Sequence, residues 1–308
     1  MGGNAAICAE HISKDYGAFR AVDDLTFEVF AGEIFALLGP NGSGKTTTIR
    51  MVLDILKPDT GRISVLGAPL NEQTKNRIGY LPEERGLYRG VPVLDVMVYL
   101  GALKGMSPKE ARRRSLALLE QLELAEHAKK KVNELSKGMQ QKVQFAVTVL
   151  HQPDLVIIDE PFSGLDPVNA MVIKRLLMDM RSAGTAVVMS THQMQQVEEM
   201  ADRLLMINRG QQRLYGQVDA VRKRYAAHAI IVEGQGDWAS LPGVVSVEPL
   251  GETNANGAGV LLHLDERATT DSVLAAIAAA GDMRIRRFEE AVPSLNDIFI
   301  QVVEAHHG

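Results

Sequence analysis

The chain has 308 residues, 46% of them hydrophobic, and a formal net charge of −5 at pH 7. This length predicts about two domains, the hydrophobic content argues against a disordered chain, and the acidic balance gives no reason to expect nucleic acid as a partner. Cys8 is the single cysteine, which excludes an intrachain disulfide and a multi-cysteine metal site.

The first part of the chain is predicted to alternate strands with turns and a single helix. Strands are expected within residues 5–38, and at 61–66 and 77–81. The apolar run 34–38, IFALL, has the length and composition of a buried strand. Residues 46–56 contain neither Pro nor Gly, which predicts a helix that ends before Pro58.

Residues 87–150 are predicted to be mainly helical. Within them, Ser107, Pro108 and Glu110 form a typical helix start, in which the Ser caps the helix and the Pro occupies the first turn. Leucines at helical spacing extend this helix to about residue 123.

From residue 155, strands and helices alternate along the chain. We expect a buried strand at 155–160, a helix at 168–183, a buried strand at 185–191 and a hairpin at 203–216. Such alternation is typical of an α/β fold with a mainly parallel sheet.

The composition changes after about residue 225, which indicates a second, smaller domain. Its expected elements are strands at 229–234, 244–250, 259–265 and 283–290, and helices at 270–280 and 294–304. We therefore divide the chain into an α/β domain at 1–225 and a small α+β domain at 226–308. The sequence of the smaller domain contains no phosphate loop and no cluster of candidate metal ligands.

No apolar run in the sequence reaches the roughly 18–20 residues that a membrane-spanning helix needs. The N-terminal segment MGGNAAICAEHISKDYG has no basic start followed by a long apolar core, so it does not resemble a secretory signal. We therefore expect a soluble cytoplasmic protein, and any action at a membrane requires a second polypeptide that supplies the span.

Residues 39–46 read GPNGSGKT and match the phosphate-loop pattern G-x-x-x-x-G-K-[ST] at each fixed position. The predicted strand before this loop and the predicted helix after it supply the structural context that the pattern requires. Backbone N–H groups of the loop and the positive end of the helix dipole would hold phosphate oxygens. This context disfavours the alternative, a Gly-rich turn that binds nothing.

The loop therefore predicts a site for a nucleoside triphosphate. Lys45 would place its charge on the outer phosphates, and the Thr46 hydroxyl would ligate Mg²⁺. The loop residues expected to contact the nucleotide are Gly39, Asn41, Gly42, Ser43, Gly44, Lys45, Thr46 and Thr47.

An apolar strand that ends in Asp159 and Glu160 supplies the second half of the expected site. Asp159 at the strand tip would hold the Mg²⁺ shell. Glu160 would polarise a water molecule aimed at the terminal phosphate, as a general base. Taken alone, an Asp-Glu pair at a strand end is equally a solvated loop start, and the upstream phosphate loop favours the nucleotide site.

Residues 135–144, LSKGMQQKVQ, resemble the signature sequence of ATP-binding-cassette (ABC) ATPases, which is usually LSGGQ. Ser136 and Gly138 match it, whereas Lys137 and Met139 depart from it. On its own, the segment would be interpreted as an ordinary helix capped by Ser136. The resemblance implies a second anion-binding helix start, which in this family completes the ATP site of a facing subunit.

Three further positions match the family. The segment SGLD at 163–166 resembles the D-loop, with Asp166 at the dimer seam. His192 resembles the switch histidine, which would bond the terminal phosphate and orient the catalytic water. Tyr16 matches the aromatic residue that stacks on adenine. Without the family, a lone His after a strand is more often structural, and Tyr16 is only a strand residue.

One departure concerns the residue between the Mg²⁺ site and the membrane-subunit contact. The segment IGYLPEERGLY has Glu83 where the family usually has Gln. Glu83 could still take an oxygen position near Mg²⁺, but it adds a negative charge and lacks an N–H donor. One expectation is that Glu83 weakens the binding of Mg·ATP or makes it depend more strongly on Mg²⁺. The other is that Glu83 replaces the usual Gln without a change of role.

The resemblance, which covers residues 5 to about 220, implies an ATP-binding and ATP-hydrolysing transporter subunit that uses ATP and Mg²⁺. A homodimer, or a dimer with a related ATPase subunit, would close around two ATP molecules and drive a separate integral-membrane permease. The chain would then lie on the inner face of the cell membrane through that permease. The segments LPEERGLY, LSKGMQQK and PSLNDIFI resemble a bacterial branch that includes sodium and drug exporters.

Other functions fit the sequence less well. A soluble ABC ATPase that acts on ribosomes or DNA usually carries two ATPase domains or a long coiled-coil insertion, and this sequence has neither. A kinase or GTPase would leave the signature segment and His192 unexplained. A dinucleotide-binding loop would need Gly at position 47, which is Thr47.

Overall fold

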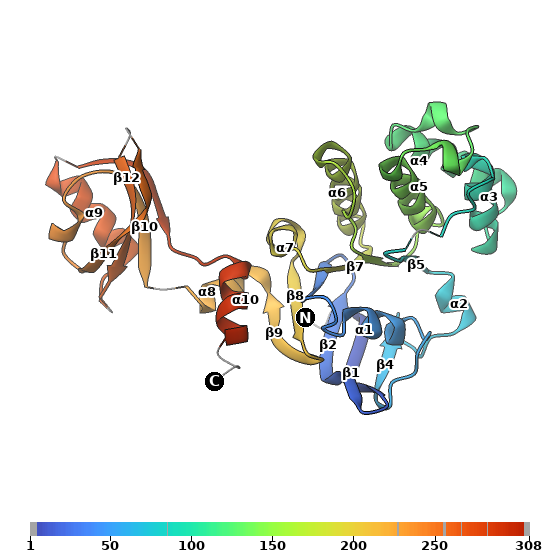
Figure 1. Cartoon of the computed structure of the whole chain (residues 1–308), viewed down its shortest axis with the longest axis horizontal. Helices are drawn as coiled ribbons and strands as arrows, with labels where there is room; N and C mark the ends of the chain where they lie inside the picture. The colour runs from blue at the N-terminus through green and yellow to red at the C-terminus, as the bar shows by residue number, and fades with distance from the viewer. Residues whose placement is uncertain are drawn as a thin grey trace. The chain divides into compact units, whose positions relative to one another are not determined.

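The computed structural model describes residues 5–84, 86–226, 228–254, 257–265, 267–281 and 283–304. The chain divides into two compact units, Met1–Val218 and Asp219–Gly308. Figure 1 shows their elements in chain order, and each unit is described here by itself. In the described residues, none of the helices combines the length and the apolar character that crossing a membrane requires.

A six-stranded sheet forms the centre of the first unit, in the order β5-β6-β7-β3-β8-β9. Its strands are β3 (Ile34–Leu38), β5 (Ile78–Leu81), β6 (Leu155–Asp159), β7 (Ala186–Thr191), β8 (Arg203–Asn208) and β9 (Gln211–Gln217). All pairings are parallel except that of β8 with β9. Every residue of β3, β6 and β7 is buried, as expected for central strands of a parallel sheet. The predicted α/β fold with a mainly parallel sheet is confirmed.

A three-stranded antiparallel sheet, in the order β2-β1-β4, belongs to the same unit. Its strands are β1 (Ala5–Tyr16), β2 (Phe19–Phe30) and β4 (Thr60–Val65). One hydrophobic core includes side chains from both sheets and from helix α1 (Lys45–Val52), and within it the Phe27 and Phe35 rings stack with their centroids 5.8 Å apart. This shared core fixes α1, and the loop that precedes it, against both sheets.

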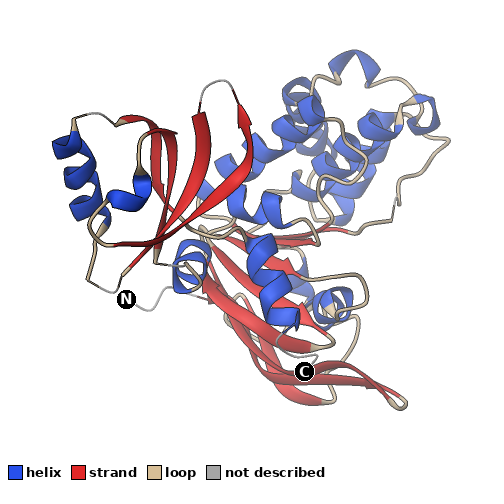
Figure 2. Cartoon of the chain, turned by 60° about the vertical axis from the view of Figure 1, so that its left-hand side comes forward, coloured by secondary structure: helices blue, strands red, loops and turns tan. Residues whose placement is uncertain are grey.

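The predicted helical region contains α3 (Val93–Leu103), α4 (Pro108–Gln121) and α5 (Lys137–Val149), together with the short 3₁₀ helices η1 (Ala125–His127) and η2 (Val132–Glu134). Ser107 caps α4 as predicted, because its hydroxyl accepts a hydrogen bond from Glu110 N at 3.2 Å. Figure 2 shows these helices grouped apart from the strands of the same unit.

Three more helices belong to the described part of the first unit: α2 (Glu72–Lys75), α6 (Pro167–Ser182) and α7 (Met194–Met200). A further helix, α8 (Val218–Arg224), starts at the last residue of this unit. The sequence predicted α6 but not α2, α7 or α8. The helix predicted at 46–56 ends earlier, at Val52. Asp54 has a left-handed φ of 59°, and Ile55 N and Leu56 N both return to Arg50 O, which closes the helix.

The second unit contains a four-stranded antiparallel sheet in the order β11-β12-β10-β13. Its strands are β10 (Ala229–Gln235), β11 (Val244–Asn254), β12 (Gly257–Leu264) and β13 (Arg284–Glu290). This order is that of a split β-α-β arrangement, with η3 (Trp238–Ser240) in the place of the first helix and α9 (Thr270–Ala280) as the second. Trp238, Val273 and Ile277 pack in the core beneath the sheet, and Figure 2 shows α9 on one face of the sheet.

The last helix, α10 (Leu295–Glu304), begins as the sequence predicted. Ser294 Oγ accepts from Asp297 N at 3.2 Å, and Asp297 Oδ2 accepts from Ser294 N at 3.1 Å, which is a reciprocal capping arrangement.

A partly buried histidine that follows α5 contacts the edge strand β5. His151 Nε2 lies 3.2 Å from Ile78 O, and its Nδ1 atom is buried without a partner. Burial and, next in size, the positive charge of Lys104 lower the pKa of His151 from 6.5 to about 4. The neutral ring, which donates from Nε2, is therefore the form that the fold accepts.

We predict that the free energy of unfolding decreases as pH falls from about 6.5 towards 4, because the unfolded chain takes up a proton at His151 that the folded chain does not. Urea unfolding at several pH values should show a smaller decrease for His151→Gln, whose amide can still donate to Ile78 O. The control is His11→Gln, at an exposed position. Equal pH dependence in wild type and His151→Gln would contradict the prediction.

Candidate nucleotide site

The phosphate loop lies between β3 and α1, as its sequence predicted. Two of its glycines allow close backbone approaches. A Cβ atom added at Gly39 would lie 2.1 Å from Ile207 O, and one added at Gly44, where φ is 113°, would lie 2.5 Å from Ala21 O. The loop therefore packs directly against β8 and against β2, and side chains at these two positions would displace it.

Lys45, the first residue of α1, extends its ammonium group across the loop. Its Nζ atom donates to Gly39 O at 2.7 Å and to Pro40 O at 3.1 Å, and the residue is buried. Burial lowers the pKa of Lys45, and the charges of Glu160, Asp159 and Glu83 act in the opposite direction. The loop carbonyls and these carboxylates keep the buried cation partnered.

Asp159 ends β6 next to the start of α1. Thr46 Oγ1 donates to Asp159 Oδ2 across 3.4 Å, a long hydrogen bond. Burial raises the pKa of Asp159, and the Glu160 charge adds to this, whereas Lys45 and the Thr46 hydroxyl oppose it. A hydroxyl and a carboxylate oxygen are ligands that suit Mg²⁺. Among the described residues, no group of three His, Cys, Asp or Glu side chains could hold a metal ion.

Glu160 and His192 form a close pair where β6 and β7 end. Glu160 Oε1 lies 2.7 Å from His192 Nδ1 and accepts from His192 N at 3.1 Å, while Thr191 Oγ1 donates to Oε2 at 3.2 Å. Glu160 is buried and has a left-handed φ of 51°, whereas the His192 side chain is half exposed. The carboxylate is thus oriented by three donors from the end of the neighbouring strand.

These groups line one cavity of about 390 Å³. It lies at the carboxyl ends of the parallel strands, where α/β sheets bind ligands. Its lining residues are Tyr16, Phe19, Ala21, Asn41, Gly42, Gly44, Lys45, Thr46, Thr47, Glu83, Asp159, Glu160, Ser163 and His192. Eleven of these lining residues were predicted from the sequence, and the structure brings them together in one cavity. The other three are Phe19, Ala21 and Ser163.

Phe19, Ala21 and Ser163 are the lining residues that the sequence did not predict. Phe19 is paired with Tyr16 across the β1–β2 hairpin. The pattern Y-G-A-F, with two aromatic residues on either side of a short turn, is the signal that could have indicated it. Ser163 begins the SGLD segment, which resembles the D-loop and is the signal that could have indicated it. Ala21 contributes through its position beside the loop, for which the sequence offers no signal.

Five predicted site residues do not line the cavity. Gly39 and Ser43 belong to the phosphate loop but do not face the cavity, and Ser43 is buried. Ser136 and Asp166 are the N-caps of α5 and α6, and they accept from Met139 N at 3.3 Å and from Asn169 N at 3.0 Å. A Cβ atom at Gly138 would lie 3.7 Å from Leu165 Cδ2, so the signature segment and the segment before α6 are neighbours.

A strand, a Gly-rich loop and a helix that carries Lys45, beside a strand that ends in Asp159, define the class of phosphate-loop nucleotide-binding proteins. The family described as ABC transporter matches residues 22–163, and the family described as ATP-binding protein DrrA1-3-like, C-terminal domain, matches residues 216–303.

Individual proteins support the same assignment. The ABC transporter ATP-binding protein YhaQ of Bacillus subtilis (strain 168) is 39% identical over 96% of this chain and 98% of its own length. The linearmycin resistance ATP-binding protein LnrL of the same organism is 34% identical over 72% of this chain and 73% of its own length. A solved structure of the ATP-binding subunit of an ABC transporter aligns with a TM-score of 0.67 and 32% identity, over 71% of this chain and 93% of that one.

The chain belongs to the family of ABC transporter ATP-binding proteins. It is an ATP-binding and ATP-hydrolysing subunit of a transporter, and this family assignment confirms the resemblance that the signature segment indicated.

We predict that Gly44→Ala weakens ATP binding at least about tenfold, because its methyl group would both strain a left-handed residue and push the loop away from Ala21. Gly67→Ala is the control, since Gly67 also has a positive φ of 85° but no atom within 4 Å of an added Cβ. Calorimetric titration with ATP would measure both affinities. Similar ATP affinity in the two variants would show that the close approach at Gly44 has no effect on binding.

Proposed function

We propose that two copies of this chain, or one copy and a related subunit, close around two ATP molecules and thereby drive a membrane permease. The observation that carries this proposal is the separation of Ser136 from the cavity that holds Lys45, Asp159 and Glu160. ABC ATP-binding subunits generally dimerise and work with membrane subunits. A signature helix that starts outside its own chain's cavity is free to complete the site of a second chain.

Within one chain, the phosphate loop and Lys45 would bind the outer phosphates. Lys45 Nζ already lies at the loop, where it donates hydrogen bonds to two backbone carbonyls. It would exchange these two hydrogen bonds for bonds to phosphate oxygens without a large movement. Thr46 and Asp159 would hold Mg²⁺, which supplies charge neutralisation at the phosphates when it is bound. Tyr16 would stack on the base through its partly exposed ring.

Glu160 is our candidate for the general base, and His192 for its positioning partner. The 2.7 Å contact between the His192 ring and the Glu160 carboxylate supports this pairing. A carboxylate held by donors on both oxygens has a fixed direction, which is what a base aimed at one water molecule needs. His192 remains exposed enough to reach a terminal phosphate from the same position.

Ser136, Gly138 and Asp166 would act on the neighbouring chain. Ser136 caps α5, and the start of this helix would bind a phosphate group of the ATP held by the neighbouring chain. The helix start at Gly138 packs beside Leu165, one residue before Asp166, and the signature and D-loop segments would therefore move together.

Glu160→Gln should lower kcat by about 10²–10⁴-fold while ATP still binds, because the amide keeps the shape but not the basicity of the carboxylate. With Mg²⁺ and ATP, we expect a stable dimer by light scattering. The control, Glu120→Gln, changes an exposed glutamate of α4 and should behave as wild type. Near-wild-type turnover in Glu160→Gln would exclude Glu160 as the base, and a strictly monomeric, ATP-loaded variant would exclude the closure.

Glu83 adds a third carboxylate to the cavity that contains Asp159 and Glu160. We propose that this charge makes ATP binding depend more strongly on Mg²⁺, because like charges repel a triphosphate that no cation neutralises.

Glu83→Gln should therefore increase the affinity for ATP in the presence of a chelator by about two- to tenfold and reduce the gain from added Mg²⁺. Titration over a range of Mg²⁺ concentrations tests this, with the neighbouring Glu84→Gln as the matched control. An unchanged Mg²⁺ dependence in Glu83→Gln would indicate a tolerated exchange.

The permease is proposed to contact the helical region that follows Glu83. Tyr88 and Tyr99 form an edge-to-face pair with ring centroids 5.8 Å apart, and about half of each residue is exposed. Leu103, further along α3, is 61% exposed. Exposed aromatic residues next to an apolar helix face are typical of protein interfaces. Through this contact the chain would sit at the inner face of the membrane.

Export is our proposed direction of transport. The sequence resembles an exporter branch in three segments, and LnrL, one of the relatives, is named for resistance to linearmycin. Resistance to a compound is consistent with its removal from the cell, and we extend this direction, but not that substrate, to the present chain.

A further inference from the structure

The β1–β2 hairpin carries Tyr16 and Phe19 at its tip, on either side of the turn formed by Gly17 and Ala18. The two aromatic residues are paired across the hairpin and line the nucleotide cavity. Tyr16 is 46% exposed and Phe19 is 62% exposed. Packing within the chain therefore does little to fix the rings, although a surface that stacks on a base must be held at the correct distance from the phosphate loop.

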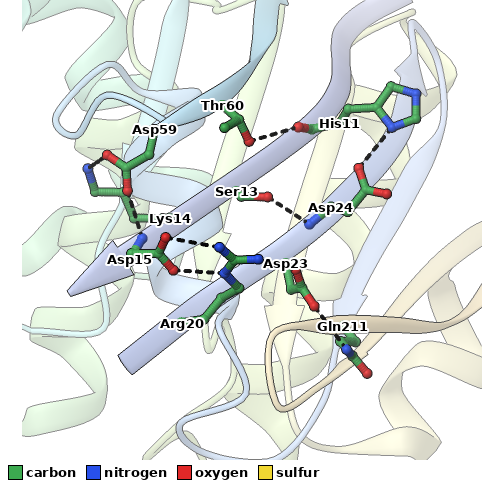
Figure 3. Close-up of polar contacts among 10 residues, drawn as sticks. All are labelled: His11, Ser13, Lys14, Asp15, Arg20, Asp23, Asp24, Asp59, Thr60 and Gln211. Carbon is green, nitrogen blue, oxygen red and sulfur yellow. Dashed lines mark hydrogen bonds and ion pairs between the residues drawn. The ribbon is translucent and has the colours of Figure 1, made fainter. Parts of the chain in front are cut away.

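A charged pair lies directly behind these rings. Asp15 and Arg20 are the next cross-strand pair of the hairpin, and neither lines the cavity. Arg20 Nε donates to Asp15 Oδ1 at 2.8 Å and Nη2 to Asp15 Oδ2 at 3.2 Å, which is a two-pronged contact (Figure 3). Neighbouring positions of a strand face opposite sides, so this pair holds the hairpin from the side away from the aromatic rings.

The same guanidinium also contacts Asp23, further along β2. Arg20 Nη1 donates to Asp23 Oδ1 at 3.0 Å, and Gln211 Nε2 donates to Asp23 Oδ2 at 2.9 Å. Figure 3 shows Arg20 between the two aspartates, with Gln211 on the far side of Asp23. Hydrogen bonds from Gln211 and then Arg20 lower the pKa of Asp23, which shows that both contacts favour the ionised carboxylate.

Asp23 is in turn fixed to the phosphate loop through the backbone. Asp23 N donates to Gly210 O at 2.9 Å, and Gly210 N donates to Ser43 O at 2.9 Å. The turn between β8 and β9 thus joins β2 to the phosphate loop. Beyond Asp23 the hairpin extends towards its tip. The Arg20 side chain connects Asp23 with Asp15 near the tip, and Asp59 accepts a further hydrogen bond from Asp15 N at 2.7 Å.

We propose that Arg20 is a positioning residue for recognition of the nucleotide base. Its ion pairs connect Asp23, which is held beside the phosphate loop, with Asp15, and thereby hold the hairpin tip that carries Tyr16 and Phe19. This inference rests on the proposed contact of Tyr16 with the base. The Arg20, Asp15 and Asp23 side chains are 55%, 39% and 30% exposed, and exposed ion pairs add little to folding stability, so the fold should survive replacement of Arg20.

The test compares ATP with inorganic tripolyphosphate, which has three linked phosphates but no base, both with Mg²⁺ and the full chain. Arg20→Ala should weaken ATP binding by about three- to tenfold, because two ion pairs are lost together, and should leave tripolyphosphate binding unchanged. In ATPase assays the KM for ATP should rise by a similar factor while kcat stays within about twofold. Arg20→Lys should fall between wild type and Arg20→Ala, because a point charge cannot make the two-pronged contact.

A double-mutant cycle separates positioning from general damage. In a Tyr16→Ala, Phe19→Ala background, Arg20→Ala should cause no further loss of ATP affinity, since there is no ring left to hold. The matched control is Arg62→Ala, which removes the ion pair of Arg62 with Glu10, also exposed and in the same three-stranded sheet. Arg62→Ala should leave the affinities for ATP and for tripolyphosphate unchanged.

Three results would overturn the inference: no loss of ATP affinity in Arg20→Ala, an equal loss for ATP and tripolyphosphate, or an additive loss in the aromatic-free background. The proposed base contact fails separately, if the Tyr16→Ala, Phe19→Ala variant binds ATP as well as wild type. Loss of affinity in that variant, with none in Arg20→Ala, would reject only the role of Arg20.

Discussion

The close packing of backbone around the phosphate loop is the constraint on which the nucleotide site depends. Gly39 meets β8 at Ile207 O, Gly44 meets β2 at Ala21 O, and Gly210 N bonds to Ser43 O. Because protein interiors are packed without spare room, these contacts leave the loop one position. The cavity residues at the ends of β6 and β7 are therefore placed relative to the phosphate loop by the core itself, which lowers the ordering cost of binding.

Electrostatics impose a second constraint on the same site. Lys45 shares the cavity with Asp159, Glu160 and Glu83, and burial acts against the charged forms of both Lys45 and Asp159. Each of these two charges supports the other. A triphosphate adds further negative charge to a cavity with one lysine and three carboxylates, so in our proposal a divalent cation strengthens binding by neutralising part of this charge.

Most of the fold could be predicted from the sequence where local pattern and tertiary environment agree. The run 34–38 is apolar throughout because β3 is buried on both faces, and Ser107 caps α4 in the way its sequence indicates. The prediction was wrong at the end of α1, where a left-handed Asp54 closes the helix without Gly or Pro. Phe19 was missed because its role depends on its cross-strand pairing with Tyr16, for which the pattern Y-G-A-F around the turn is the only local signal.

The place of β5 in the sheet has a mechanical consequence. This strand has four residues, lies at the edge of the sheet and is bonded on one side only, to β6. Glu83 follows its last residue by two positions, and the helical region begins shortly after it. A shift of β5 would break this one ladder and the hydrogen bonds of His151 and Lys104 to Ile78 O, and it would leave the pairings of β6, β7 and β3 intact. The central strands β6, β7 and β3 are thus each held by a strand on both sides, whereas β5, which leads to Glu83, is held by a strand on one side.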